Sequence, residues 1–412
     1  MELFIDIFVL VILVFMARKR IQLGHVFVIT SFLFGVLHNI SLLTLGKSLA
    51  TTFLSPSTLT ILGALFFINM MEHIMSNSGS KTRLVSSLKS LSGNPCFAMA
   101  ALPAFIGLLP SPGGAKFSAP MVEEAAKDVT ATGEQKAVIN YYYRHVWEYF
   151  LPLYPANLLA VEILNIPTGK FIMIMFPFTL ITLLIGTILF RNIHVIPNTT
   201  DINKIETGTL NNINNTYCKK ILYIFEGILP VITVVLLVLI LKLHIVLALL
   251  IVVSLMIIYY KVDLITLVNM VKKSLSPKLY YVIFGAIYFR DILQASGSID
   301  LLLNYFESID LNPLLITILF PFSISLLTGL TIPGITIALP IIITLAAPTQ
   351  IMSYACLAFV SNFIGAMLSP MHLCLILSID HFSANFTKTF RLLYIPEAIL
   401  LIFAILYSQY IL

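Results

Sequence analysis

Residues 107–125 place groups that bind ions beside residues that interrupt a helix. The stretch reads GLLPSPGGAKFSAPMVEEA and lies inside a long apolar segment. Proline has no backbone donor and glycine lets another group approach the main chain closely, so a turn here exposes N–H groups. A helix that starts after such a turn offers its positive end to an anion. The candidate binding residues of this first tip are Ser111, Pro112, Gly113, Gly114, Lys116 and Ser118.

Lys116 is the ionisable group of this tip. A charged side chain within an apolar segment is a functional candidate because its burial in lipid is costly. The ammonium can hold an anionic substrate, take the place of a bound cation, or extend along its apolar stem toward the cytoplasmic mouth. The sequence leaves these three interpretations open.

A second stretch, LTGLTIPGITIALP at residues 327–340, repeats the pattern of the first. Gly114 is followed six residues later by Pro120, and Gly334 is followed six residues later by Pro340. Hydroxyl groups again accompany the proline and the glycine. The candidate binding residues of this second tip are Thr331, Pro333, Gly334 and Thr336.

Each tip is followed by another interrupted segment with polar residues. In YYYRHVWEYFLPLYPAN, Arg144 and Glu148 are spaced to share a helix face, and Pro152 and Pro155 are expected to unwind the helix beside Asn157. The pair can serve binding or can be structural, and a neighbouring histidine can simply be packed. In SNFIGAMLSPMHLC, Ser361, Asn362 and His372 surround the interruption at Gly365 and Pro370. Broken backbone near Ser361 and Asn362 can coordinate sodium, or can be a plain kink.

The composition is that of an integral membrane protein. Of 412 residues, 59% are hydrophobic and 10% are charged, with a mean hydropathy of +0.99. A soluble domain has about 25% charged residues. We therefore expect an all-α polytopic protein of the cell (inner) membrane, with the lipid bilayer as its partner. We attribute the net charge of +5 to basic residues in cytoplasmic loops, and we predict no nucleic-acid partner. None of the four cysteines belongs to a CxxC pair or to a Cys/His cluster in the sequence, so neither a disulfide nor a metal site is predicted.

The chain is predicted to contain two repeats, 1–191 and 221–412, joined by a polar cytoplasmic linker at 192–220. Each repeat has five spans and one re-entrant hairpin, about 96–127 in the first and about 312–346 in the second. A Pro-interrupted helix follows each hairpin, at about 136–165 and about 349–379. The other expected spans lie near 3–17, 22–44, 57–76, 169–191, 221–241, 244–260, 278–294 and 390–411.

Basic residues favour an inverted relation between the two repeats. Five crossings per repeat reverse the second repeat in the membrane, and with both termini outside, most basic clusters fall on the cytoplasmic side. The loop SGSIDLLLNYFESIDLN carries no basic residue and falls outside. The alternative, in which the prolines only kink ordinary spans, spoils this charge pattern.

The segments FIGLLPSPGGAKFSAPMVEEAA and RHVWEYFLPLYP resemble an uncharacterised integral membrane family of bacteria and archaea, of the domain of unknown function 401 type. That family is grouped with the ion transporter superfamily and is distantly similar to gluconate permeases and divalent anion/sodium symporters. The resemblance implies two inverted repeats, re-entrant hairpins, interrupted helices and a homodimer with an elevator-like movement. Members of the superfamily carry organic anions, arsenite, or sodium against protons. The Ser-Asn-Thr tip of the dicarboxylate symporters is replaced here by Ser111-Pro112-Gly113-Gly114.

The expected function is secondary active transport of a small anionic organic solute, without catalysis. Arg144, Asn157, Asn362 and His372 are expected to line the cavity beside the tips. Sodium or proton is the expected coupling ion, and no cofactor is predicted. A cation/proton antiporter is the alternative, which needs a midplane carboxylate from Glu148, Glu162 or Asp291. A membrane-embedded enzyme or lipid-handling protein is a third interpretation, for which no nucleophile or metal set is found.

Overall fold

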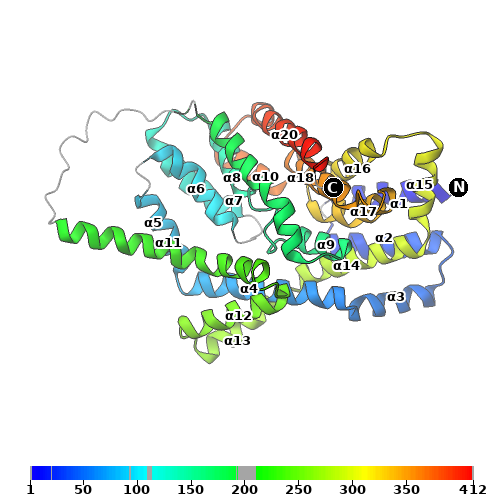
Figure 1. Ribbon diagram of the computed structural model, residues 1–412, viewed down its shortest axis with the longest axis horizontal. Coiled ribbons are helices and arrows are strands. Elements are labelled where there is room, and N and C mark those ends of the chain that lie inside the picture. The colour runs from blue at the N-terminus through cyan, green and yellow to red at the C-terminus, as the bar shows by residue number, and fades with distance from the viewer. Residues whose placement is uncertain are drawn as a thin grey trace.

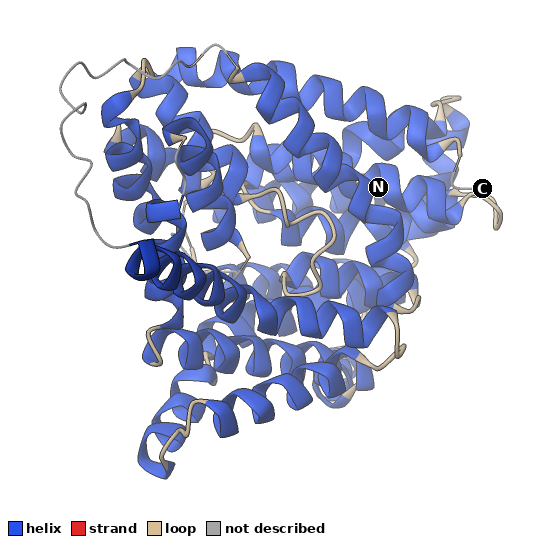
Figure 2. Cartoon of the chain, turned by 60° about the vertical axis from the view of Figure 1, so that its left-hand side comes forward, coloured by secondary structure: helices blue, strands red, loops and turns tan. Residues whose placement is uncertain are grey.

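The computed structural model describes residues 2–19, 21–91, 94–108, 114–191, 193 and 210–410. Within these residues the protein consists of helices and connecting loops, with no strand (Figures 1 and 2). Four helices are long and apolar enough to cross a membrane: Pro56–Asn77, Thr168–Leu189, Lys219–Leu239 and Phe386–Ser408. The protein is thus an all-helical, multi-pass membrane protein.

The first part of the chain alternates long spans with shorter helices. Its elements are α1 (Glu2–Arg18), α2 (Leu23–Leu37), α3 (Leu42–Leu54), α4 (Pro56–Asn77), α5 (Ser80–Leu91), α6 (Pro95–Gly107), α7 (Gly114–Ala125), η1 (Ala126–Asp128), α8 (Gly133–Arg144), α9 (Pro155–Leu164) and α10 (Thr168–Leu189).

The second part follows with elements of similar type and order. They are α11 (Leu210–Leu239), α12 (Ile245–Tyr259), α13 (Leu264–Ser274), α14 (Pro277–Ala295), α15 (Ser298–Ser308), α16 (Pro313–Thr328), α17 (Thr331–Leu345), α18 (Ile351–Met367), α19 (Leu373–His381) and α20 (Phe386–Ser408).

The helices pack as two sets. The first set, along the lower side of Figure 1, includes α3, α4, α12 and α13, with α2 packed on α14 and α12 packed on α4. Above it lie α6, α7 and α8 on one side and α16, α17 and α18 on the other. Helix α6 packs on α7, and α16 packs on α17. Helix α7 also contacts α19, and α17 contacts α9, so each paired-helix unit touches a helix from the other part of the chain.

Both predicted helix breaks are present. Helix α8 ends at Arg144 and α9 starts at Pro155, so the chain between them is irregular. Helix α18 ends at Met367 and α19 starts at Leu373. Pro152 and Pro370 lie in these two gaps, where a residue without an N–H and with a fixed φ prevents the helix from continuing.

Two predicted boundaries need correction. The expected span 22–44 ends at Leu37, because the His38 ring lies 3.0 Å from the Phe34 carbonyl and Asn39 has a φ of 59° in the left-handed region. The separate helix α3 follows, with Leu42 and Leu43 each 70% exposed. The linker predicted at 192–220 is also shorter than expected, since α11 already begins at Leu210.

A polar cluster fixes α1 against the rest of the first helix set. The Ser298 hydroxyl at the start of α15 lies 3.0 Å from Asp6 Oδ1 on α1 and 3.1 Å from His38 Nε2 after α2. The His38 and Asp6 side chains are themselves 3.0 Å apart. Because Asp6 and Ser298 are buried, these contacts hold three elements that are distant in sequence in one place.

Candidate functional site

A cavity of about 500 Å³ lies where the two helix breaks meet. One wall comes from the first helix set, through residues of α4, α13 and α14 such as Asn69 and Lys273. The opposite wall comes from the break after α8, the turn before α17 and the break before α19. The residues that these three segments contribute are Arg144, His145, Glu148, Tyr154, Pro155, Gly329, Leu330, Thr331, His372, Leu373 and Cys374.

Three helices of the wall formed by the breaks and the second tip begin at this cavity, and α14 begins there from the other wall, at Ser276. The N-cap residues of those three are Tyr154 for α9, Leu330 for α17 and His372 for α19, and all three line the wall. For none of these described N-caps does the side chain accept a hydrogen bond from the first turn. The first N–H groups of a helix have no partner within the helix, and they carry partial positive charge. The positive ends of these helices therefore lie at the cavity wall, an arrangement that suits an anion.

Arg144 provides a buried cation at the same place. It is the last residue of α8 and is only 3% exposed. Its guanidinium lies directly against Gly114, the first residue of α7, where a Cβ would overlap Nη2. Its carbonyl lies against Gly107, the last residue of α6. The absence of a side chain at both glycines lets the end of α8 enter the gap between α6 and α7.

Asn362 holds the start of α17 in position. The Asn362 amide, on α18, donates to the Thr331 carbonyl at 3.1 Å and accepts from the Ser325 hydroxyl at 2.5 Å. Gly334 lies so close to this amide that a Cβ would overlap its oxygen. Pro333 and Thr336 are buried within α17, with the Thr336 hydroxyl donating to the Ile332 carbonyl. Pro333, Gly334 and Thr336 therefore support the tip from within, whereas Thr331 lines the cavity.

The first tip is only partly described. Ser111, Pro112 and Gly113 lie outside the described residues, while Gly114 is buried against Arg144. Ser118 is buried, and its hydroxyl lies 3.4 Å from the Gly114 and Ala115 carbonyls of its own helix. Lys116 is exposed and does not line the cavity.

Of the predicted residues near the breaks, Asn157 and Ser361 do not line the cavity, whereas His372 does. The Asn157 side chain donates to the Leu151 carbonyl at 2.8 Å and so closes the break after α8. Ser361 is buried on α18, and its hydroxyl has no hydrogen-bond partner among the described residues. His372 lines the cavity, with Nδ1 3.0 Å from the Ala366 carbonyl. The structure thus brings together Arg144, Thr331 and His372, and keeps Asn157 and Asn362 as supports.

Sequence reasoning did not assign Lys273, Tyr154 or Cys374 to the site. Lys273 comes from α13, an amphipathic helix that was not expected as a separate element. Cys374 lies in an apolar run, and its nearness to His145 depends entirely on how the two breaks fold together. For Tyr154, the position directly before Pro155 was the available signal. Proline is common at the first position of a helix, so the residue before it is a candidate N-cap.

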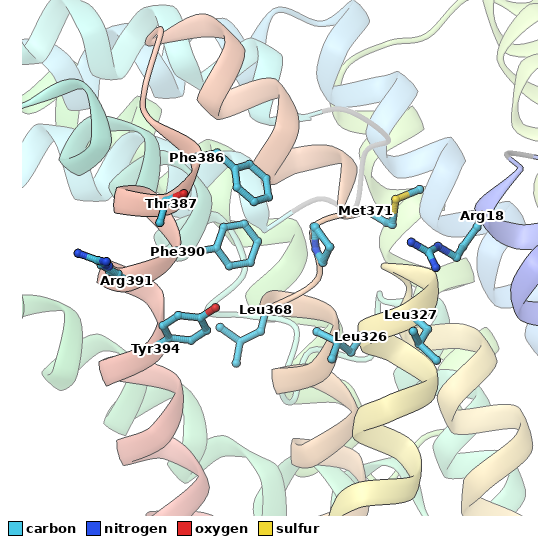
Figure 3. Close-up of a pocket in the computed structure, with 11 residues that line it drawn as sticks. Arg18, Leu326, Leu327, Leu368, Met371, Phe386, Thr387, Phe390, Arg391 and Tyr394 are labelled. Atoms are coloured by element: carbon cyan, nitrogen blue, oxygen red, sulfur yellow. The ribbon is translucent and has the colours of Figure 1, made fainter.

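A second cavity of about 500 Å³ lies near the end of α16, the break after α18 and the start of α20 (Figure 3). Leu326, Leu327, Phe390 and Tyr394 give it an apolar lining, with Arg18 and Arg391 at opposite ends. Among the residues that the structure describes, no sequence-predicted site residue lines it, and the lining includes none of the three N-cap residues Tyr154, Leu330 and His372. The two cavities are similar in volume, so the convergence of helix starts and Arg144 distinguishes the first.

Comparison with known proteins supports the fold. The family described as "Protein of unknown function (DUF401)" matches residues 2–411. No curated protein matches the chain. Among solved structures, the crystal structure of the Alcanivorax borkumensis YdaH transporter, described as having an unusual topology, is similar with a TM-score of 0.56 and 15% sequence identity. The similarity covers 90% of this chain and 88% of that one.

Proposed function

Because the chain belongs to the DUF401 family of unknown function and shares a fold with a transporter, we propose that it is a secondary active transporter. The proposed solute is a small organic anion, bound in the cavity between the two helix breaks. The observation that carries this proposal is the meeting of three helix starts with the buried Arg144 in one cavity. Discontinuous helices that point their positive ends at an anion are a common feature of transporters.

The proposed architecture is a pair of inverted repeats, 1–191 and 221–412. Each repeat contains one hairpin, α6–α7 or α16–α17, that re-enters the membrane. Matching contacts support this arrangement: α2 packs on α14 as α12 packs on α4, and α7 packs on α19 as α17 packs on α9. In this proposal the residues of the first tip complete the anion site from the side opposite Thr331.

The proposed mechanism is elevator-type alternating access. Helices α1 to α4 and α11 to α14 would form the scaffold, and the hairpins with the broken helices would form the moving unit. The scaffold has exposed apolar side chains, such as Leu222 at 64% and Leu229 at 57% on α11, which suit lipid or a second copy in a homodimer. Sodium or proton would couple transport, with Ser361 and Asn362 as the proposed sodium ligands.

One observation favours a second candidate, a cation/proton antiporter. Glu148 lines the cavity, and its carboxylate is 3.6 Å from the His145 ring. A carboxylate in such a position can exchange a cation for a proton. Sodium-driven proton movement in proteoliposomes, measured with a pH-sensitive dye and no organic anion, would favour this candidate over the first.

A ligand screen tests the proposed function. Purified protein is heated with and without gluconate, citrate, succinate or aspartate, each in sodium and in potassium buffers. A ligand that binds the folded state raises its stability by about 2.7 kcal/mol at a concentration one hundred times its Kd. We expect stabilisation by at least one carboxylate and uptake of that carboxylate into proteoliposomes. Stabilisation by sodium alone would contradict the anion proposal.

Replacing Gly114 by valine is expected to weaken anion binding strongly while leaving folding largely intact. The new side chain would occupy the place of the Arg144 guanidinium, the far end of a flexible side chain that can move aside. Losing one charge-assisted contact costs about 1.5–3 kcal/mol, or roughly ten- to hundredfold in affinity. The matched control is Lys116→Ala on the same helix, which should change affinity less than about twofold because Lys116 is exposed and outside the cavity. A tenfold loss in Lys116→Ala would place this lysine in the site, and sodium dependence appearing in that variant would identify it as a substitute cation.

The proposed orientation predicts opposite labelling of two equivalent helices. Ser86 on α5 and Ser308 on α15 are both exposed. In intact cells, a membrane-impermeant maleimide should label Ser308→Cys. It should label Ser86→Cys only after the cells are opened. The unchanged protein, with its native cysteines, gives the background labelling. This result is expected because basic residues surround α5, which favours the cytoplasmic side, and are absent from α15. Reversed labelling would overturn the orientation.

A further inference from the structure

Two histidines and a cysteine meet in the cavity wall. One ligand atom each from His145, His372 and Cys374 lies within 4.8 Å of the other two. His145 belongs to the break after α8, whereas His372 and Cys374 belong to the start of α19. The two imidazole rings are perpendicular, with centroids 5.0 Å apart, and the Tyr141 ring packs against both. Nitrogen and sulfur donors at this spacing are the ligand types of a structural or catalytic zinc site.

In both histidine rings, a backbone carbonyl occupies Nδ1 and leaves Nε2 available to bind a metal ion. Nδ1 of His145 is 2.6 Å from the Tyr141 carbonyl, and Nδ1 of His372 is 3.0 Å from the Ala366 carbonyl. A carbonyl oxygen only accepts, so each Nδ1 carries the proton and each Nε2 keeps its lone pair. A backbone carbonyl bound to the other ring nitrogen is the usual outer support of a metal-bound histidine.

Glu148 lies beside this group and could complete it as a fourth ligand, although its carboxylate is outside the set of atoms that lie within 4.8 Å of one another. Its Oε1 is 3.6 Å from His145 Nε2, and the residue lines the same cavity. A divalent ion bound by two neutral imidazoles, one thiolate and one carboxylate gives a site of zero net charge. Such a site can lie near the buried Arg144 without repelling it.

We infer that His145, His372 and Cys374 form a binding site for a divalent ion of the zinc class, which Glu148 completes when its carboxylate turns toward them. A mixed nitrogen, sulfur and oxygen set excludes sodium, magnesium and calcium, which prefer oxygen ligands alone. Tetrahedral zinc holds ligand atoms roughly 3.3–3.6 Å apart, so the side chains close by about 1 Å when the ion binds. The ion would join the two helix breaks. This inference does not rest on the proposed anion transport.

Cobalt is the probe that tests the site, because a thiolate bound to Co²⁺ gives a charge-transfer absorption band in the near ultraviolet. Purified full-length protein, stripped with a chelator, is titrated with Co²⁺ and then with Zn²⁺. We expect one Co²⁺ per chain, a thiolate band, and its loss when Zn²⁺ is added. Cys374→Ser should remove the band, and His145→Gln or His372→Gln should weaken binding by about 100-fold or more. Cys356→Ser and His381→Gln, which change residues outside the cavity, are the matched controls.

A second measurement covers the case in which a variant does not fold. In the unchanged protein, N-ethylmaleimide should alkylate Cys374 after metal removal, and Zn²⁺ should protect Cys374 but not Cys96, as mass spectrometry would show. A thiolate band that survives in folded Cys374→Ser, equal alkylation of Cys374 with and without Zn²⁺, or no bound Co²⁺ would overturn the inference.

Discussion

Arg144→Gln is expected to lower the affinity for the proposed anionic solute roughly 30-fold to several thousand-fold, or about 2–5 kcal/mol. Arg144 is 3% exposed and lies beside three helix starts, so its charge acts in a region with little water to screen it. Arg144→Lys keeps the charge but loses the planar pair of donors, and an intermediate loss is expected. Thermal-shift titration with the best carboxylate of the screen measures each affinity.

Arg391→Gln is the matched control for this variant. Arg391 is an exposed arginine of the second cavity, on α20 (Figure 3). Its replacement should leave the affinity within about twofold, as expected for an exposed charge. A strong loss in Arg391→Gln together with none in Arg144→Gln would move the anion site to the second cavity.

Gly334→Ala is expected to destabilise the protein by about 2–5 kcal/mol and to abolish transport. A methyl group at this position would overlap Asn362 Oδ1 and would lie 2.5 Å from Ser325 Oγ. Asn362 is fully buried and bonded on both sides, so it has no room to withdraw. The start of α17 would be pushed away from α18. Unfolding in mixed micelles of rising SDS content, followed by the fluorescence of the single tryptophan, measures the loss.

Two further variants show whether this overlap is the cause. A methyl group at Gly46 on α3 would meet no atom within 4 Å, so Gly46→Ala should be neutral or stabilising by up to about 1 kcal/mol. Adding Asn362→Ala to Gly334→Ala removes the obstructing amide, and the double variant should lose less stability than the sum of the two single variants. Additive losses would show that Gly334 and Asn362 act independently.

The helix breaks were predictable from sequence because their causes are local. Pro152 and Pro370 each lack a donor and fix φ, and each lies in a gap between two helices. The long apolar spans were predictable for a similar reason, since a run of apolar side chains is itself the signal. The end of α2 at Asn39 was missed, because a left-handed residue inside an apolar run leaves hydropathy unchanged.

The site itself was only partly predictable. Arg144 and His372 stood out as polar residues beside proline breaks, and both line the cavity. The grouping of His145 with Cys374 is a product of tertiary structure, as the two residues belong to breaks far apart in the chain. Helix α13, which contributes Lys273, is amphipathic and mixes polar with apolar residues. A search for long apolar runs therefore does not detect it.

The short helices at the breaks have an electrical consequence. Helices α9 and α19 contain 10 and 9 residues, so at 1.5 Å per residue each extends about 14–15 Å, half of a hydrocarbon layer of about 30 Å. In the proposed architecture, the cavity where they begin lies within the region over which the transmembrane voltage falls. A monovalent anion entering an inside-negative cell alone works against about 2.3 kcal/mol per 100 mV. Uptake of such an anion with one cation is electrically silent, and each additional cation lets the membrane potential drive accumulation.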